Sequence, residues 1–159
     1  MIALREASHL DLGYVESMLK WCIDEGALFL ADGGYSPERG ARSLTRILQD
    51  PGALRIVWEV DDKVAGCLLA TIADHPWCET RFTNVDLMYI KPELRRAPIF
   101  DRMINLLEGY AEMNGAVPLL QITSGLNLER MHKLMNRKGY THAGGTLLKR
   151  GVEHGHASH

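Results

Sequence analysis

Basic residues near the middle of the chain lie where a strand is expected to end and a helix to begin. Residues 85–90 form a short apolar run rich in β-forming side chains, and Arg95 and Arg96 follow it. Pro98 then precedes a long amphipathic segment. Proline suits the first position of a helix because its φ is fixed and its missing N–H would be unpaired there. Unpaired N–H groups and the positive end of the helix dipole attract anions. The spacing therefore predicts a phosphate-binding site at this helix N-terminus.

The composition argues against several functional classes. The chain has 159 residues, of which 46% are hydrophobic and 24% charged, and its formal net charge is −2. This balance gives no electrostatic basis for binding nucleic acid or an acidic membrane, and we expect neither partner. The sequence shows no run of 18 apolar residues, no signal-like N-terminus, and three widely spaced cysteines typical of reduced thiols. We therefore expect a cytoplasmic protein without a metal site.

Hydrophobic periodicity predicts one α/β (α+β) domain over residues 1–150, followed by a flexible tail over 151–159. The expected order is strand, two helices, three strands, helix, strand, helix, strand. The expected strands are 2–5, 53–60, 63–73, 81–90, 117–123 and 140–150, and the expected helices are 10–25, 37–49, 98–114 and 128–138. A crossover helix requires strand 117–123 to run parallel to strand 81–90, so the central sheet is expected to be mixed.

This order, together with three local motifs, resembles the GCN5-related N-acetyltransferase (GNAT) superfamily and its fold. Residues 87–96 resemble the family's strand-and-loop signature, in which a hydrophobic strand leads into Pro-Glu-x-Arg. Residues 106–116 are similar to its central helix, and residues 127–140, which end in Arg-Lys-Gly-Tyr, resemble its Asn-to-Gly-Phe block. The resemblance covers about residues 2–150. The paired arginines and the run 124–130 look most like members carried by bacteriophages and prophages.

The resemblance implies acetyl-CoA as the co-substrate and an amine, on a small molecule or a protein, as the acceptor. In the family, the end of the fourth strand pairs its backbone with the pantetheine arm, and the following loop wraps the pyrophosphate. The residues to which the resemblance assigns cofactor binding are Met88, Tyr89, Ile90, Arg95, Arg96, Ala97, Pro98, Ile99, Phe100 and Asn127. Asn127 is alternatively a simple helix cap.

Asp86 falls where many family members carry an acidic general base. An alkyl ammonium group has a pKa of about 10.4, so it must lose a proton before its nitrogen can attack a thioester. A carboxylate accepts that proton directly or through a water molecule. The alternative reading of Asp86 is an ordinary polar residue that is satisfied at a strand bulge.

The pyrophosphate loop and the last helix depart from the family pattern. The family's loop reads Arg-x-x-Gly-x-Gly/Ala, and both small positions are replaced here, by Pro98 and Phe100. Pro98 removes an N–H donor, Phe100 adds bulk, and Asp101 is expected in the first helical turn, where its charge competes with a bound anion. Met135 stands where the family commonly has a tyrosine that protonates the departing thiolate.

Two functional hypotheses follow from these residues. The first is an acetyl-CoA-dependent N-acetyltransferase that moves an acetyl group to a primary amine by direct attack. The second is a catalytically weak or inactive GNAT-fold binding module that acts on a partner protein. A terminal strand without an obvious second partner also favours a homodimer.

Overall fold

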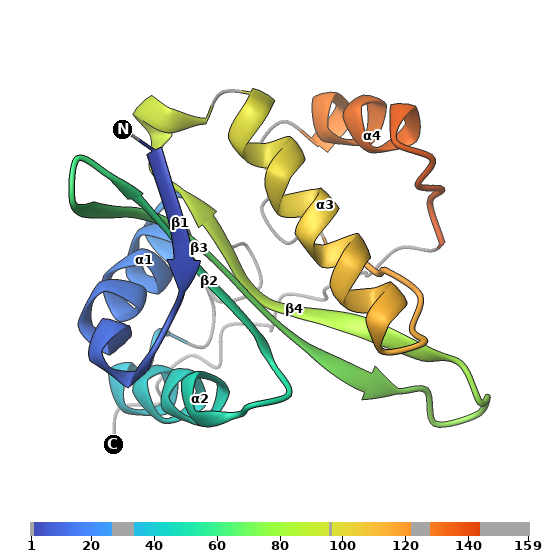
Figure 1. The fold of residues 1–159 in the computed structure, drawn as a ribbon, viewed down its shortest axis with the longest axis horizontal. Helices are drawn as coiled ribbons and strands as arrows, with labels where there is room; N and C mark the ends of the chain where they lie inside the picture. Colours follow the sequence, from blue (N-terminus) through green and yellow to red (C-terminus); the bar gives the residue numbers. More distant parts are fainter. Residues whose placement is uncertain (1, 27–33, 96, 122–127, 144–159) are drawn as a thin grey trace, which may run out of the picture. The chain divides into compact units, whose positions relative to one another are not determined.

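The computed structural model describes residues 2–26, 34–95, 97–121 and 128–143. The chain forms two compact units. The first consists of Met1–Cys22 and Ser36–Gln121, and the second of Ile23–Tyr35 and Ile122–His159. The first unit contains the sheet and most of the helices, and the second contains the helix α4 (Leu128–Arg137) (Figure 1).

A four-stranded antiparallel sheet forms the centre of the first unit. Its order is β1 (Ile2–Glu6), β2 (Leu54–Val60), β3 (Lys63–Asp74) and β4 (Arg81–Ile90). A two-residue hairpin joins β2 to β3 at Asp61 and Asp62, whose φ angles of 50° and 60° match the twist of the flanking strands. The four strands predicted for this region are confirmed. Short connections join β2 to β3 and β3 to β4, whereas residues 7–53 connect β1 to β2.

Three helices cover the two faces of the sheet. They are α1 (Leu12–Asp24), which follows a 3-10 turn at His9–Asp11, α2 (Pro37–Gln49) and α3 (Ala97–Met113). The predicted start of α2 is confirmed, because the Ser36 side chain accepts a hydrogen bond from the Arg39 N–H and Pro37 takes the first helical position. Helices α1 and α2 share one face of the sheet, and α3 lies across the other (Figure 1).

Two apolar cores result from the alternation of side chains along the strands. Cys67 and Leu69 of β3 pack with α1 and α2, whereas Leu68 and Ala70 pack with α3. These four side chains are fully buried, because β3 is a central strand with helices on both faces. The position of β4, which pairs with β3 along its length, is therefore set by the best-packed part of the molecule.

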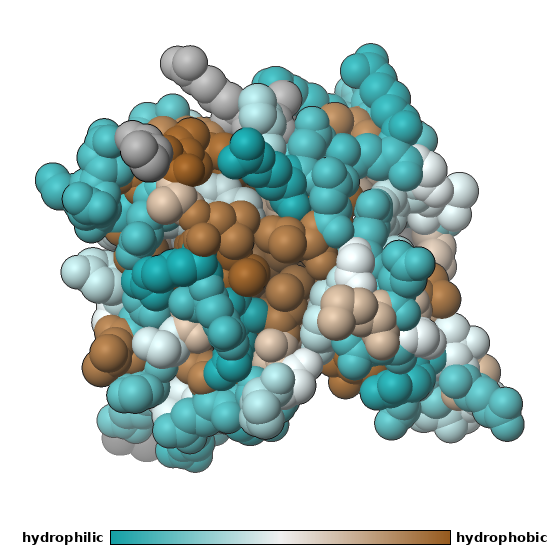
Figure 2. Space-filling view, viewed as in Figure 1, coloured by the Kyte–Doolittle hydropathy of each residue, from teal (hydrophilic) through white to brown (hydrophobic). Residues whose placement is uncertain are grey.

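The α3 side of the sheet is less completely covered toward β1. Figure 2 shows apolar side chains gathered in the middle of this face. Ile2 and Leu4 of the edge strand β1 are 46% and 42% exposed, and Leu4 pairs with Trp58, which belongs to the α3-side core. The homodimer stays a prediction. No helix in the described part of the chain is long and apolar enough to cross a membrane.

Helix α3 begins one residue earlier than predicted. It starts at Ala97, so Pro98 occupies its second position, where a missing N–H is equally harmless. Asp101 is consequently the fifth residue of the helix, and the first turn carries no acidic side chain. The expectation that Asp101 competes with an anion in the first turn is therefore wrong.

The C-terminal third matches the prediction only in part. The stretch 117–121 forms a single bridge, Val117 to Phe82, which runs parallel to β4 as expected but does not extend into a strand. Helix α4 ends as predicted near Gly139, whose φ of +87° suits glycine, and the Tyr140 N–H donates to the Met135 carbonyl. Residues 140–143 form no strand, and Asn127 and 144–150 lie outside the described residues.

We expect Gly66 to be essential for the close pairing of β3 with β4. A Cβ at Gly66 would lie 2.8 Å from the Tyr89 carbonyl oxygen and 3.4 Å from the Ile90 Cα. The substitution Gly66→Ala is expected to lower the free energy of unfolding by about 1–3 kcal/mol, because backbone atoms must move apart. Gly109→Ala, in the middle of α3 with nothing within 4 Å, is the control and should raise it by about 0.5–1 kcal/mol. Urea unfolding measures the free energy of unfolding of both variants. A Gly66→Ala variant as stable as the wild type would contradict the close approach of β3 and β4.

Candidate active site

A one-residue bulge interrupts the pairing of β4 with β3. Leu87 is opposite Leu69 and Val85 is opposite Ala70, so Asp86 has no residue of its own across the ladder. Such a bulge turns the extra side chain away from the regular alternation of the strand. Asp86 is accessible to solvent although protein atoms surround part of its carboxylate, and the two carboxylate oxygen atoms have different partners. The bulge that was considered for Asp86 from its sequence context is therefore present.

Polar side chains from both strands hold the Asp86 carboxylate. The Thr71 hydroxyl donates to Oδ2 at 3.0 Å, and the Asn84 amide nitrogen donates to Oδ1 at 2.8 Å. Desolvation by neighbouring protein atoms raises the pKa of Asp86, while these hydrogen bonds and the charge of Arg46 oppose that rise. The net direction is upward. A carboxylate with a raised pKa is a better proton acceptor near neutral pH than an ordinary one.

The edge of β4 that faces away from β3 is open beyond Thr83. The Thr83 N–H donates a hydrogen bond to the Val117 carbonyl. The buried Thr83 hydroxyl donates to the Leu119 carbonyl and accepts from the Leu119 N–H. Within the described residues, no strand pairs with this edge from residue 84 onward. Among the described residues, the hydrogen bonds between segment 117–121 and β4 thus end at Thr83, before the bulge at Asp86.

The bulge decides which backbone groups reach this open edge. The Lys91 N–H donates to Ala65 of β3, so by the antiparallel alternation the N–H and C=O of Ile90 and Met88 point to the opposite edge. Tyr89 faces Cys67 of β3 instead, and its ring is buried in the α1–α2 core. Met88 and Ile90 therefore offer main-chain donors and acceptors to an extended amide chain, as an added strand would use them.

Arg95 folds back onto the end of β4. Its Nε donates to the Ile90 carbonyl oxygen at 2.7 Å, and its guanidinium lies 5.3 Å from the centre of the Tyr89 ring. A second cation, the Lys91 ammonium, lies 5.4 Å from the Trp21 ring, and the Trp21 and Tyr89 rings are 6.1 Å apart. Two positive side chains are thus held by aromatic rings beside the strand end.

The start of α3 lies after this loop and keeps the features of an anion site. The N–H groups of Ala97, Ile99 and Phe100 belong to the first four residues of the helix and lack intrahelical acceptors. The Ile99 side chain is buried and that of Phe100 is partly buried, both in the α3-side core. The bulk of Phe100 is consequently turned inward, contrary to the expected obstruction, while Pro98 is exposed. Arg96 and the side chain of Ala97 lie outside the described residues.

Comparison with known proteins identifies the family. The model of the Acetyltransferase (GNAT) family matches residues 21–140. The chain belongs to this family. It is accordingly an acyltransferase whose co-substrate is acetyl-CoA. No curated protein sequence matches the chain significantly.

Solved structures of other proteins share the GNAT fold at low sequence identity. A predicted acetyltransferase from Clostridium acetobutylicum, solved with acetyl-CoA, has a TM-score of 0.74 and 18% identity over 98% of this chain and 100% of its own. The ribosomal-protein-alanine N-acetyltransferase of Brucella melitensis biovar Abortus 2308 has a TM-score of 0.64 and 17% identity, with 96% and 100% covered. AAC(6')-Iy, in complex with the bisubstrate analog CoA-S-monomethyl-acetylneamine, has a TM-score of 0.69 and 15% identity, with 96% and 99% covered.

The residues that the structure describes fit a CoA thioester. The open edge at Met88 and Ile90 suits the amides of the pantetheine arm, and the first N–H groups of α3 suit a pyrophosphate. No cluster of three or more metal-ligating side chains gathers in the described ranges. Thr71, Asn84 and Thr83 did not stand out in the sequence, because isolated polar residues in strands carry no periodic signal.

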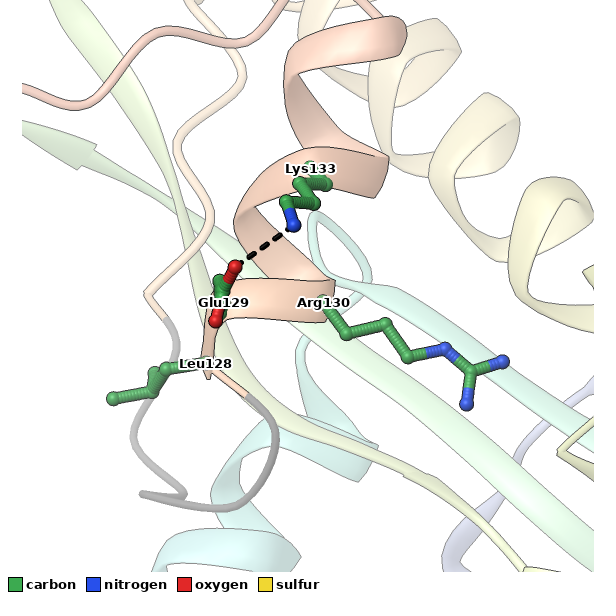
Figure 3. Close-up of a pocket in the computed structure, with 4 residues that line it drawn as sticks. All are labelled: Leu128, Glu129, Arg130 and Lys133. Carbon is green, nitrogen blue, oxygen red and sulfur yellow. Dashed lines mark hydrogen bonds and ion pairs between the residues drawn. The ribbon is translucent and has the colours of Figure 1, made fainter.

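A hollow in the second unit lies at the start of α4. It is lined by Leu128, Glu129, Arg130 and Lys133, and Figure 3 shows Arg130 extending away from the other charged side chains. Glu129 and Lys133 form an ion pair of 2.8 Å one turn apart along the helix. The charges of Glu129 and Lys133 thus neutralise each other, whereas Arg130 has a separate direction.

We expect Asp86 to lower the stability of the folded protein at neutral pH. Since folding raises its pKa, the ionised carboxylate is disfavoured in the folded state; this penalty is full above the folded pKa and vanishes below the ordinary aspartate pKa of about 4. Asp86→Asn should therefore raise Tm at pH 7 and leave it unchanged near pH 3. Asp62→Asn, at a hairpin position with φ of 60°, is the control. A lower Tm for Asp86→Asn at pH 7 would contradict the direction of the shift.

Proposed function

We propose that this GNAT protein transfers the acetyl group of acetyl-CoA to a primary amine by direct attack, with Asp86 as the general base. The observation that carries the proposal is the position of Asp86 at the bulge, immediately before the open edge at Met88 and Ile90. A thioester whose pantetheine arm follows this edge is brought to the same part of β4 as the carboxylate. The base and the reacting carbon are then supplied by one strand.

The donor is bound, in this proposal, through main-chain groups and arginines together. Met88 and Ile90 pair with the pantetheine amides, and the first N–H groups of α3 hold the pyrophosphate with help from Arg95 and Arg96. Arg95 leaves the Ile90 carbonyl when the pantetheine arm arrives and exchanges that contact for a phosphate oxygen. Its side chain compensates in this way for the donor lost at Pro98.

The acceptor nitrogen loses two protons in the reaction. The acceptor ammonium gives one proton to the Asp86 carboxylate, and the resulting neutral nitrogen attacks the thioester carbonyl carbon. The carbon–sulfur bond breaks as the amide forms, and the sulfur leaves as the thiol with the second proton of the nitrogen. Asp86 then releases its proton to solvent. The backbone N–H near Ile90 is proposed to stabilise the negative charge that develops on the carbonyl oxygen.

The acceptor is a primary amine of a small molecule or a protein. Similar folds are found in a protein named for ribosomal-protein alanine and in one solved with an acetylneamine analog, so the fold accommodates both classes. The solvent-accessible Asp86 carboxylate supports an ammonium-bearing acceptor, because its charge attracts the cation before it accepts the proton.

We expect Arg95→Ala to weaken acetyl-CoA binding by about tenfold, because one charge-assisted contact to phosphate is lost. Isothermal titration with acetyl-CoA, and with desulfo-CoA to exclude thiol effects, measures the change. Arg39→Ala, which removes the same charge from the exposed surface of α2, should leave the affinity unchanged.

An acetyl-pantetheine fragment that lacks the phosphates separates the two contacts of Arg95. It should bind Arg95→Ala at least as well as the wild type, because the Ile90 carbonyl is freed. Equal acetyl-CoA affinity of Arg95→Ala and wild type would contradict the phosphate contact. No binding of acetyl-CoA to the wild type up to millimolar concentration would instead favour the binding module.

Asp86→Asn is expected to reduce kcat by about 10²–10⁴-fold, because the amide cannot accept the proton of the ammonium. Release of the CoA thiol during incubation with a panel of primary amines measures the rate. Acetyl-CoA affinity should not change, since Asp86 is not part of the proposed cofactor contacts. Asp62→Asn is the matched control and should retain full activity. Wild-type rates for Asp86→Asn across pH 6–9 would refute the assignment of the base.

A further inference from the structure

Thr71 and Asn84 form a pair that encloses the Asp86 carboxylate from two strands. They lie opposite each other in the β3–β4 ladder, one residue beyond the bulge. Thr71 donates to Oδ2 at 3.0 Å and Asn84 donates to Oδ1 at 2.8 Å, so each carboxylate oxygen accepts a bond from its own donor. Two separate donors on a planar group leave it little freedom to rotate.

The two donors also act on the charge of the carboxylate. Hydrogen bonds to an ionised carboxylate favour the charged form, which opposes the effect of desolvation at this site. The other groups that interact with Asp86 electrostatically are Arg46 from α2, whose charge also favours the ionised form, and the Tyr110 hydroxyl from α3. Tyr110 is held by the Gly52 carbonyl at 2.7 Å. Thr71 and Asn84 thus each donate a hydrogen bond directly to one of the two carboxylate oxygen atoms.

We propose that Thr71 and Asn84 are positioning residues that orient the Asp86 carboxylate toward the acceptor nitrogen and set the lowest pH at which it accepts a proton. The inference rests on the proposed function, in which Asp86 is the base. Both residues act through Asp86 and touch neither substrate. Substitution of either residue should leave the fold intact, because Thr71 and Asn84 do not belong to the buried core.

The direction of the effect follows from the sign of the hydrogen bonds. Removal of one donor destabilises the ionised carboxylate, so a higher pH is needed to ionise it and the acid limb of kcat/KM moves upward. On that limb, Thr71→Val should lose up to about tenfold in kcat/KM relative to the wild type. At pH 9 Asp86 is ionised in both the wild type and the variant. The loss of kcat/KM should there shrink to the part that is caused by the altered orientation of the carboxylate.

The experiment compares pH profiles of kcat/KM from pH 5 to 9 for the full chain and four variants. Thr71→Val and Asn84→Ala each remove one donor, and each should shift the acid limb to higher pH. Thr71→Ser keeps the hydroxyl and should return the limb to the wild-type position. Thr80→Val changes a threonine in the β3–β4 connection and is the matched control, with no shift. Circular dichroism confirms that each variant is folded.

Two outcomes distinguish failure of this inference from failure of the proposed function. If Asp86→Asn is inactive but Thr71→Val and Asn84→Ala both keep the wild-type acid limb, the positioning role is overturned while Asp86 remains the base. If Asp86→Asn keeps wild-type activity, the base assignment itself fails. In the double variant Asp86→Asn with Thr71→Val, the second change should have no further effect, because the two residues act on one step. An additional loss there would overturn the positioning role.

Discussion

The single-residue bulge at Asp86 determines what the second half of β4 presents to its surroundings. A strand alternates with a period of two, so one extra residue exchanges both the faces and the edges of every residue after it. With the bulge, Leu87 and Tyr89 pack on the α1–α2 side, whereas Met88 and Ile90 turn to the α3 side and to the open edge. Core packing and the groups at the open edge of β4 therefore both depend on the bulge at Asp86, the candidate base.

The neighbouring strand β3 makes this arrangement rigid. Its middle residues are buried on both faces, and at Gly66 it approaches β4 so closely that a methyl group would collide with the Tyr89 carbonyl. Both donors to the Asp86 carboxylate come from these paired strands rather than from loops. A catalytic group held on packed strands keeps its geometry better than one held on a mobile loop.

The end of β4 and the start of α3 are joined by the contact between Arg95 and the Ile90 carbonyl. In the proposed function that carbonyl belongs to the edge for pantetheine and the guanidinium binds a phosphate, so one side chain would serve both parts of the cofactor. Helical periodicity sends Ile99 and Phe100 into the core, so the bulky side chain at the second replaced position packs inward.

Local patterns determined most of the secondary structure. Periods of 3.6 and 2 residues, the Ser36-Pro37 start and the Asp61-Asp62 turn act within a few residues, so the helices and the antiparallel strands of the first unit follow from the sequence alone. The same pattern, together with the resemblance, led to the GNAT fold and to Asp86. Tertiary structure decided toward which edge of β4 the backbone groups of Met88 and Ile90 point. It also decided the inward direction of the Phe100 side chain, the first residue of α3, and the hydrogen bonds of Thr71 and Asn84 to Asp86. These features depend on register and packing between segments distant in sequence, and no local periodicity encodes them.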